Sequence, residues 1–408
     1  TIGLLQLLLY PAAIILAIFW TLKRRGSSLR QDSYTISDMN AFLIRAAFWA
    51  VVLVGCVDSL ISFLRVEDML SGLVGEAMDK NLGRSQFRGP YVHIPLIILG
   101  IILVIIVFVA IHIASGSNTV TLARAKTTFG VYDKVMDLAP LACPTGDQTR
   151  LCDYYIASSS YSVFPSSYTS DYISDSILPL VIKAGARLIE LDIYAGDKDK
   201  PVVGLKNEQF GYDYAKNSVS LESCCVSIAN SAFNKSETKS ADDPFILSLM
   251  FHTPKTTTIN ASAEILKQTL SKYFLGPEYA FQRKNLAQEP ICNLSGKLIL
   301  VSGGEIKGTA LEELINLSWN TSDLRRISYM TASQPYDHEE LINNNRKSIT
   351  MVVPDPDPDL KNNNPVILFG YGCQWNLMNY GSLDSMMELY IGKFQQGSLL
   401  LKPEHLRY

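Results

Sequence analysis

The chain has 408 residues, of which 48% are hydrophobic and 18% are charged. Soluble globular domains carry about 25% charged residues, so this balance indicates that part of the chain lies in lipid. The apolar content excludes a disordered polyelectrolyte. The net charge of −3 gives no general case for nucleic acid as a partner. Seven cysteines in this length do not make a disulfide scaffold.

Apolar segments concentrate in residues 1–115, where we predict a helical membrane region with two to three transmembrane helices. The run Ile94–Ile111 has no charged or polar side chain. At about 1.5 Å rise per residue it spans roughly 27 Å, close to the hydrocarbon thickness of a bilayer. It therefore predicts a span at about residues 92–114.

Two further segments complete this predicted region. A span at about residues 2–22 is followed directly by Lys23, Arg24 and Arg25. No basic region precedes it and no small-residue cleavage site is clear, so we interpret it as an anchor rather than a signal peptide. Residues 41–64 contain Arg45 and Asp58 near their ends, where snorkelling can place both charges in the interface. This segment is either a third span or an interfacial helix.

The side of the membrane that faces the C-terminal body is poorly determined by charge. With three spans, six basic residues near the membrane share the side of the body and four lie in the 65–91 loop, which leans towards a cytoplasmic body. The two sets are Lys23, Arg24, Arg25, Arg30, Arg124 and Lys126 against Arg65, Lys80, Arg84 and Arg88.

The body also contains N-x-S/T triplets, which alone are not a sign of secretion because they arise by chance. They begin at Asn234, Asn260, Asn293, Asn316 and Asn320.

A polar linker, residues 116–150, precedes a body of alternating strand and helix patterns over residues 151–408. Helical patterns are expected at Ser174–Ala184 and Ala261–Phe274. Alternating elements over this length predict an α/β fold, and a single (β/α)₈ barrel has the right size. Strands are expected at Tyr154–Ala157, Arg187–Tyr194, Phe245–Phe251, Lys297–Val301, Ser348–Val353 and Val366–Phe369.

Several motifs of this body, taken in order, resemble phosphoinositide-specific phospholipase C. The segment Gly185–Asp192, reading GARLIELD, resembles the X region of that family, as do Phe245–Leu249 with His252 and the strand at Gly296–Leu300. Gly372-Cys-Gln374, Asn379 and Leu401-Lys-Pro403 resemble the Y region. The resemblance covers residues 150–408 and implies a distorted TIM (β/α)₈ barrel of the phospholipase C-like type.

The family's chemistry uses two imidazoles, which the matched positions of this chain lack. The first histidine is replaced by Ser160 and the second by Leu205. No histidine occurs between His112 and His252, so no shift of the alignment restores them. Without a group that titrates near neutral pH, a histidine-based cleavage loses its general base. His252 itself matches a family position without a catalytic role. We therefore predict no catalytic residues.

The metal and substrate positions implied by the resemblance are also altered. Tyr161 stands at the calcium-binding asparagine, Met250 at a calcium-binding carboxylate and Val301 or Ser302 at a phosphate-binding lysine. Only Glu190 and Asp192 keep the identity of calcium ligands. Because Ca²⁺ takes six to eight oxygens, we expect no cofactor, with a weak Ca²⁺ or Mg²⁺ at this vestigial pair as the alternative.

Two further motifs of the body could carry chemistry. The pair Cys224-Cys225 matches no metal motif, so buried free thiols are expected, with pairing to Cys143, Cys152, Cys292 or Cys373 as the alternative. Gly303-Gly304 follows a strand without the lysine of a phosphate-binding loop and predicts a turn.

The sequence thus predicts an integral, multi-pass membrane protein whose barrel is a pseudoenzyme. It would act as a structural or interaction component of a membrane-associated assembly, with the lipid bilayer and other membrane or assembly proteins as partners and no nucleic acid. A structural protein of a large DNA virus particle is one alternative. Another is a divergent phosphodiesterase that uses Glu190, Asp192 and His252 in a rearranged site. A non-cleaving sensor of inositol phosphates needs basic side chains, for which Lys206 is the nearby candidate.

Overall fold

The structure, a computed structural model, describes residues 118–408 except 145, 166–170, 208–211, 320 and 357–358. The predicted spans at about 2–22, 41–64 and 92–114 lie outside these residues. Within the described ranges, no helix is both long enough and apolar enough to cross a bilayer.

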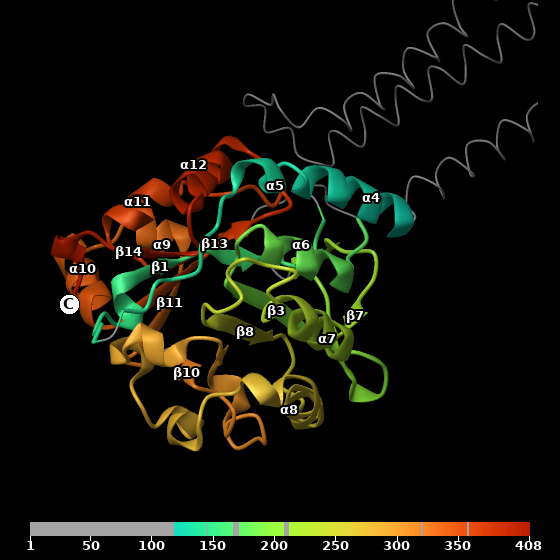
Figure 1. Cartoon of the computed structure of the whole chain (residues 1–408). Coiled ribbons are helices and arrows are strands. Elements are labelled where there is room, and N and C mark those ends of the chain that lie inside the picture. The colour runs from blue at the N-terminus through green and yellow to red at the C-terminus, as the bar shows by residue number, and fades with distance from the viewer. Residues whose placement is uncertain (1–117, 145, 166–170, 208–211, 320, 357–358) are drawn as a thin grey trace, which may run out of the picture. The chain divides into compact units, whose positions relative to one another are not determined.

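Parallel strands follow one another around a nearly closed barrel (Figure 1). The final strand of the barrel pairs back with its first strand, whereas the described residues show no ladder between β10 and β11. The barrel is therefore open at that one point. Its strands are β2 (Ser158–Ser160), β3 (Leu188–Ala195), β8 (Phe245–Phe251), β9 (Leu298–Ser302), β10 (Leu317–Ser318), β11 (Leu324–Ser328), β12 (Ile349–Val353) and β13 (Trp375–Asn379).

Smaller strand pairs extend this sheet or lie apart from it. Antiparallel β4 (Pro201–Val203) pairs with the last residues of β3, Ile193–Ala195, and β7 (Val219–Ser220) pairs with β4. A two-residue hairpin is formed by β5 (Lys206–Asn207) and β6 (Tyr212–Asp213). Antiparallel β1 (Tyr154–Ile156) and β14 (Leu399–Leu401) join the beginning of the barrel to its end. These additions leave the parallel barrel as the frame of the fold.

Helices lie on the outside of the barrel (Figure 1). They cover an outer apolar layer that is separate from the apolar cluster inside the barrel, to which Leu188, Ile246 and Trp375 belong. The helices are α4 (Asn118–Phe129), α5 (Tyr132–Val135), α6 (Leu178–Lys183), α7 (Leu221–Ser231), α8 (Thr256–Leu270), α9 (Tyr329–Ser333), α10 (His338–Lys347), α11 (Pro365–Gly370) and α12 (Ser385–Phe394).

The predicted elements compare with these bounds as follows. The strand expected at Phe245–Phe251 is observed with the same bounds, and those at Arg187–Tyr194 and Lys297–Val301 are shifted by one residue. The strand expected at Val366–Phe369 is wrong, because this segment lies in helix α11. Asn364 Oδ1 accepts the Val366 N–H (3.0 Å) and caps the helix, whose first residue is Pro365.

Residues 118–135, in the stretch expected to be a linker, form α4 and α5 and pack onto the barrel. Ala125, Phe129 and Tyr132 are buried in the outer apolar layer. The Tyr132 hydroxyl donates to the carbonyl oxygen of Tyr380 (2.8 Å). Apolar side chains at a spacing of three to four residues therefore attach this segment to the body.

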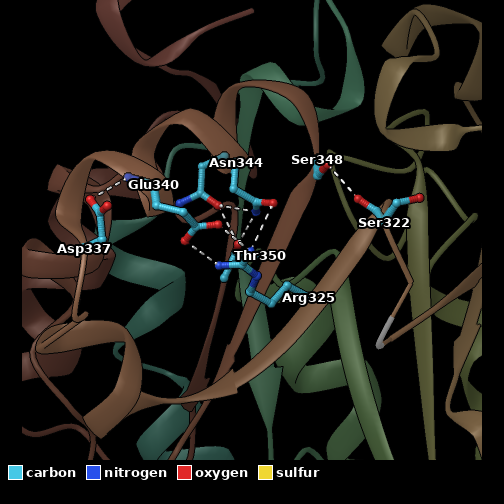
Figure 2. Close-up of polar contacts among 8 residues, drawn as sticks. Ser322, Arg325, Asp337, Glu340, Asn344, Ser348 and Thr350 are labelled. Atoms are coloured by element: carbon cyan, nitrogen blue, oxygen red, sulfur yellow. Dashed lines mark hydrogen bonds and ion pairs between the residues drawn. The ribbon is translucent and has the colours of Figure 1, made fainter.

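Polar contacts attach α10 to the outer face of β11 and β12 (Figure 2). Arg325 donates through Nη1 and Nη2 to the two carboxylate oxygens of Glu340 (3.0 and 2.7 Å). Asp337 Oδ1 accepts the Glu340 N–H (3.0 Å) and caps the helix. Asn344 Nδ2 donates to Thr350 Oγ1 (3.4 Å). These bonds fix Arg325 on the outside of the barrel, which leaves the next residue of β11 on the inside.

The described cysteines divide into a disulfide and buried thiols. Cys143 and Cys292 form a disulfide across 149 positions of the sequence, a pairing that the sequence did not indicate. Cys224 and Cys225 are buried free thiols, as predicted. Burial raises the pKa of Cys225 to about 12, so this thiol stays protonated near neutral pH.

Candidate functional site

The candidate site is a set of polar side chains inside the barrel. Alternation along β3 turns Glu190 and Asp192 to the same side as Leu188, which belongs to the interior cluster. The neighbouring strand β8 pairs in register, with Ser248 opposite Glu190 and Met250 opposite Asp192. The barrel therefore brings the two predicted carboxylates together on one wall.

Both carboxylate oxygens of Glu190 are engaged. Ser248 Oγ donates to Oε2 (3.0 Å), and Arg326 Nη2 donates to Oε1 at the same distance. The side chains of Glu190 and Arg326 are 7% and 20% exposed, so their ion pair is largely withdrawn from water. A largely buried carboxylate needs such partners, because an unpaired buried charge is strongly unfavourable.

Arg326 lies among three carboxylates and against an aromatic ring. Burial alone lowers the pKa of Arg326, but the charge and hydrogen bond of Glu190, together with Asp192 and Glu305, outweigh it and raise the pKa above the usual value. The guanidinium carbon lies 5.2 Å from the Trp319 ring centroid. A permanent positive charge therefore pairs with Glu190 and is stabilised by the charges of Asp192 and Glu305.

The sequence reasoning missed Arg326. It named Lys206 as the basic residue near the site. Lys206 Nζ does lie 5.4 Å from the centroid of the Tyr194 ring, but Lys206 is half-exposed and pairs with Asp213 (3.6 Å) on a hairpin. The available signal was the pair Arg325-Arg326 in a short run of strand-forming residues. Alternation in a strand sends one of two consecutive residues inward.

Asp192 is engaged with a histidine. His252 Nε2 and Asp192 Oδ1 are 2.7 Å apart. The His252 ring also stacks on Tyr194, with centroids 4.6 Å apart and planes 7° from parallel. Both side chains are less than one-fifth exposed. The arrangement orients one imidazole and one carboxylate and holds the ring against an aromatic face.

The positions predicted to be degenerate are placed as follows. Ser160 is buried at the end of β2, and its Oγ has no hydrogen-bond partner in the described part of the chain. Leu205 is buried in the outer apolar layer, whereas Val301 is buried and Met250 half-buried in the barrel's interior cluster. Tyr161 adopts the left-handed backbone conformation (φ 53°) and packs on the outer layer. Apolar packing thus occupies most of these positions.

This arrangement does not suit a divalent cation. Ca²⁺ takes six to eight oxygen ligands. Here Glu190 already accepts from Ser248 and Arg326, Asp192 is bonded to His252, and Met250 offers no oxygen. Among the described residues, no group of three or more His, Cys, Asp or Glu side chains is arranged to hold a metal ion. The Arg326 guanidinium already binds a Glu190 oxygen that a calcium ion would need as a ligand.

Comparisons with known proteins agree with this fold. Residues 148–302 match the family model of the phosphatidylinositol-specific phospholipase C X domain. The barrel is similar to PLC21 of L. pealei, with 19% identity and a TM-score of 0.55, covering 65% of this chain and 38% of that chain. PLC21 of S. officinalis gives 20% identity and the same TM-score and coverage. No curated protein sequence matches the chain.

The match at residues 148–302 lies within a nearly closed α/β barrel, and it confirms the resemblance of this part of the sequence to the X region of phosphatidylinositol-specific phospholipase C. The chain covers about 38% of the two PLC21 chains. A calcium-dependent phosphoinositol-specific phospholipase C from a Pseudomonas species matches 59% of this chain at 13% identity, with 92% of that chain covered and a TM-score of 0.40. Members of this family are phosphodiesterases.

Proposed function

We propose that this chain is a membrane-anchored, non-catalytic phospholipase C-like protein whose barrel is a structural or interaction module. The observation that carries the proposal is the ion pair between Arg326 and Glu190. In this pair, the fixed positive charge of Arg326 engages Glu190, one of the two side chains that keep the identity of a calcium ligand. A guanidinium bonded to Glu190 repels a cation and uses an oxygen that would otherwise ligate it.

Proton transfer supports the same proposal. Cleavage of a phosphodiester by this family uses two imidazoles, whereas the corresponding positions here are Ser160 and Leu205. Both are buried, and Leu205 packs in the outer layer rather than in the barrel interior. A serine hydroxyl does not ionise near neutral pH and a leucine has no titratable group, so neither replaces a general base.

A divergent phosphodiesterase is the second candidate, favoured by the contact between His252 and Asp192. A carboxylate that orients an imidazole is a common arrangement in general-base catalysis. This candidate has one imidazole where the family uses two, and that ring is stacked on Tyr194. The phosphate of a substrate would also have to compete with Glu190 for Arg326.

The membrane setting belongs to the proposal as well. The apolar segments of residues 1–115 would anchor the chain as a multi-pass protein in the bilayer. Other membrane or assembly proteins would bind the barrel. A non-catalytic barrel on a membrane anchor suits a membrane-associated assembly, such as the particle of a large DNA virus.

Hydrolysis of phosphatidylinositol by the purified full-length chain tests the proposal. The protein, reconstituted in detergent or lipid discs, is incubated with phosphatidylinositol vesicles and millimolar Ca²⁺. We expect release of inositol phosphate equal to that of a buffer blank. Turnover that is lost in Asp192→Asn and kept in Asp213→Asn, an exposed carboxylate on the hairpin, would reject the proposal in favour of the second candidate.

A further inference from the structure

Asn234 lies in an exposed turn between α7 and β8. Asn234, Lys235 and Ser236 are all exposed and spell one of the N-x-S/T triplets. Asn234 Oδ1 accepts both the Ser236 N–H (3.1 Å) and the Ser236 hydroxyl (2.9 Å). The amide and hydroxyl of this triplet are therefore in contact with each other and accessible from solvent.

The other described triplets differ from this one. Asn316 is buried, where its Oδ1 accepts the Leu300 N–H (2.8 Å) inside the barrel wall. Asn260 is exposed on α8, but the hydroxyl of its triplet, on Ser262, is fully buried and donates to a carbonyl oxygen within the helix. Asn293 is exposed and bonded to Glu289 (2.8 Å).

The disulfide is an independent observation on the same face of the barrel. Cys143 is exposed and Cys292 half-buried, whereas the four free cysteines of the described chain are all buried. A disulfide that reaches solvent persists in an oxidising compartment and is reduced in the cytosol. Its formation removes two protons and two electrons from the thiols, which an oxidised dithiol exchange catalyst of that compartment accepts.

Both features lie at the amino-terminal ends of the barrel strands. Asn234 precedes β8, and Cys292 precedes β9. The Leu141 N–H donates to Asp243 Oδ1 (2.7 Å), which ties the segment that carries Cys143 to the turn before β8. His252, in contrast, follows the carboxyl end of β8. A group attached at Asn234 would leave the candidate site uncovered.

We infer that the barrel faces an oxidising, extracytoplasmic compartment and carries an N-linked oligosaccharide on Asn234. The inference reverses the cytoplasmic lean of the charge count. In the covalent step, Asn234 Nδ2 forms a bond to the anomeric carbon of an oligosaccharide donated by a lipid pyrophosphate. The bond between that carbon and the pyrophosphate oxygen breaks, the lipid pyrophosphate leaves, and the amide gives up one proton.

Glycosidase sensitivity of the full-length chain tests the inference. The chain is expressed in a eukaryotic cell and its gel mobility is compared with and without peptide N-glycosidase. We expect the glycosidase to increase the mobility of the wild type. In Asn234→Gln and in Ser236→Ala this increase should be smaller by the contribution of one glycan. Ser236→Thr keeps a hydroxyl at this position and should keep the glycan. Asn260→Gln, the matched exposed control, should migrate like the wild type.

The state of the disulfide is read in the same preparation after thiols are blocked at lysis. A linked peptide pair containing Cys143 and Cys292 is expected in the unreduced digest. A wild-type chain that glycosidase leaves unchanged would overturn the inference, as would an Asn234→Gln chain that migrates like the glycosylated wild type. Alkylation of both cysteines without reductant would overturn the assignment of the compartment.

Discussion

Replacing Arg326 with methionine should destabilise the barrel more than the same change at its neighbour Arg325. The substitution leaves Glu190, which is 6% exposed, with its Ser248 hydrogen bond but without its ion-pair partner. Breaking a buried ion pair by removing one partner costs about 3–5 kcal/mol. Arg325→Met is the matched control, since its partner Glu340 is half-exposed, and an exposed pair contributes about 0–1 kcal/mol.

A double variant, Glu190→Gln with Arg326→Met, isolates the interaction between the guanidinium and the carboxylate. Glu190→Gln keeps an acceptor for Ser248 and removes the charge that Arg326→Met would leave unpaired. The cost of the double variant should therefore be smaller than the sum of the two single costs by about 1–3 kcal/mol. Two costs that add within about 0.5 kcal/mol would show that the guanidinium and the carboxylate do not stabilise each other.

Alkylation of buried thiols measures these costs in the full-length chain. Cys224 and Cys225 are fully buried, so a brief pulse of alkylating reagent modifies them only after the barrel opens. Labelling of their peptide is followed by mass spectrometry over a series of denaturant concentrations in one detergent. The midpoint shift of each variant, compared with that of Arg325→Met, gives the change in the free energy of unfolding.

The same assay checks three further predictions. Burial lowers the pKa of Lys402 to about 8, below the value of about 10.4 for an unfolded lysine. Below the folded pKa, the folded barrel therefore carries the full cost of a charged Lys402. The free energy of unfolding should rise by on the order of 2–3 kcal/mol between about pH 8 and 10. Lys402→Met should lose this rise. Arg187→Met leaves the carbonyl oxygens of Ala232, Asp243 and Pro244 without their donor and should cost about 3–5 kcal/mol; a loss under about 1 kcal/mol would contradict this. Asp337→Ala removes the cap of α10 and should cost about 1 kcal/mol, whereas Asp337→Asn should cost little.

Periodicity predicted much of the fold from the sequence. A mostly apolar run, interrupted by Ser248 alone and bounded by Pro244 and His252, identified β8 with its observed bounds, because a strand buried on both faces leaves that pattern. The strand expected at Val366–Phe369 was wrong because four apolar residues fit a strand or a helix equally well. The preceding Asn364-Pro365, a helix start signal, would have decided between them.

The candidate site was predicted only in part. Glu190 and Asp192 were found through the resemblance, because both lie in the segment Gly185–Asp192 that resembles the X region. Arg326 was missed because β11, with two consecutive arginines, carries little apolar signal. The disulfide joins cysteines 149 positions apart, and cysteine pairing cannot be deduced from sequence alone. Contacts between distant strands decide both features.

Equilibrium dialysis of the full-length chain against radioactive calcium tests the central claim most directly, namely that Arg326 takes the place of a divalent cation. At millimolar free Ca²⁺, the account predicts no bound calcium above that of Glu190→Gln. One calcium ion bound per chain at micromolar concentration, and lost in Glu190→Gln, would contradict it.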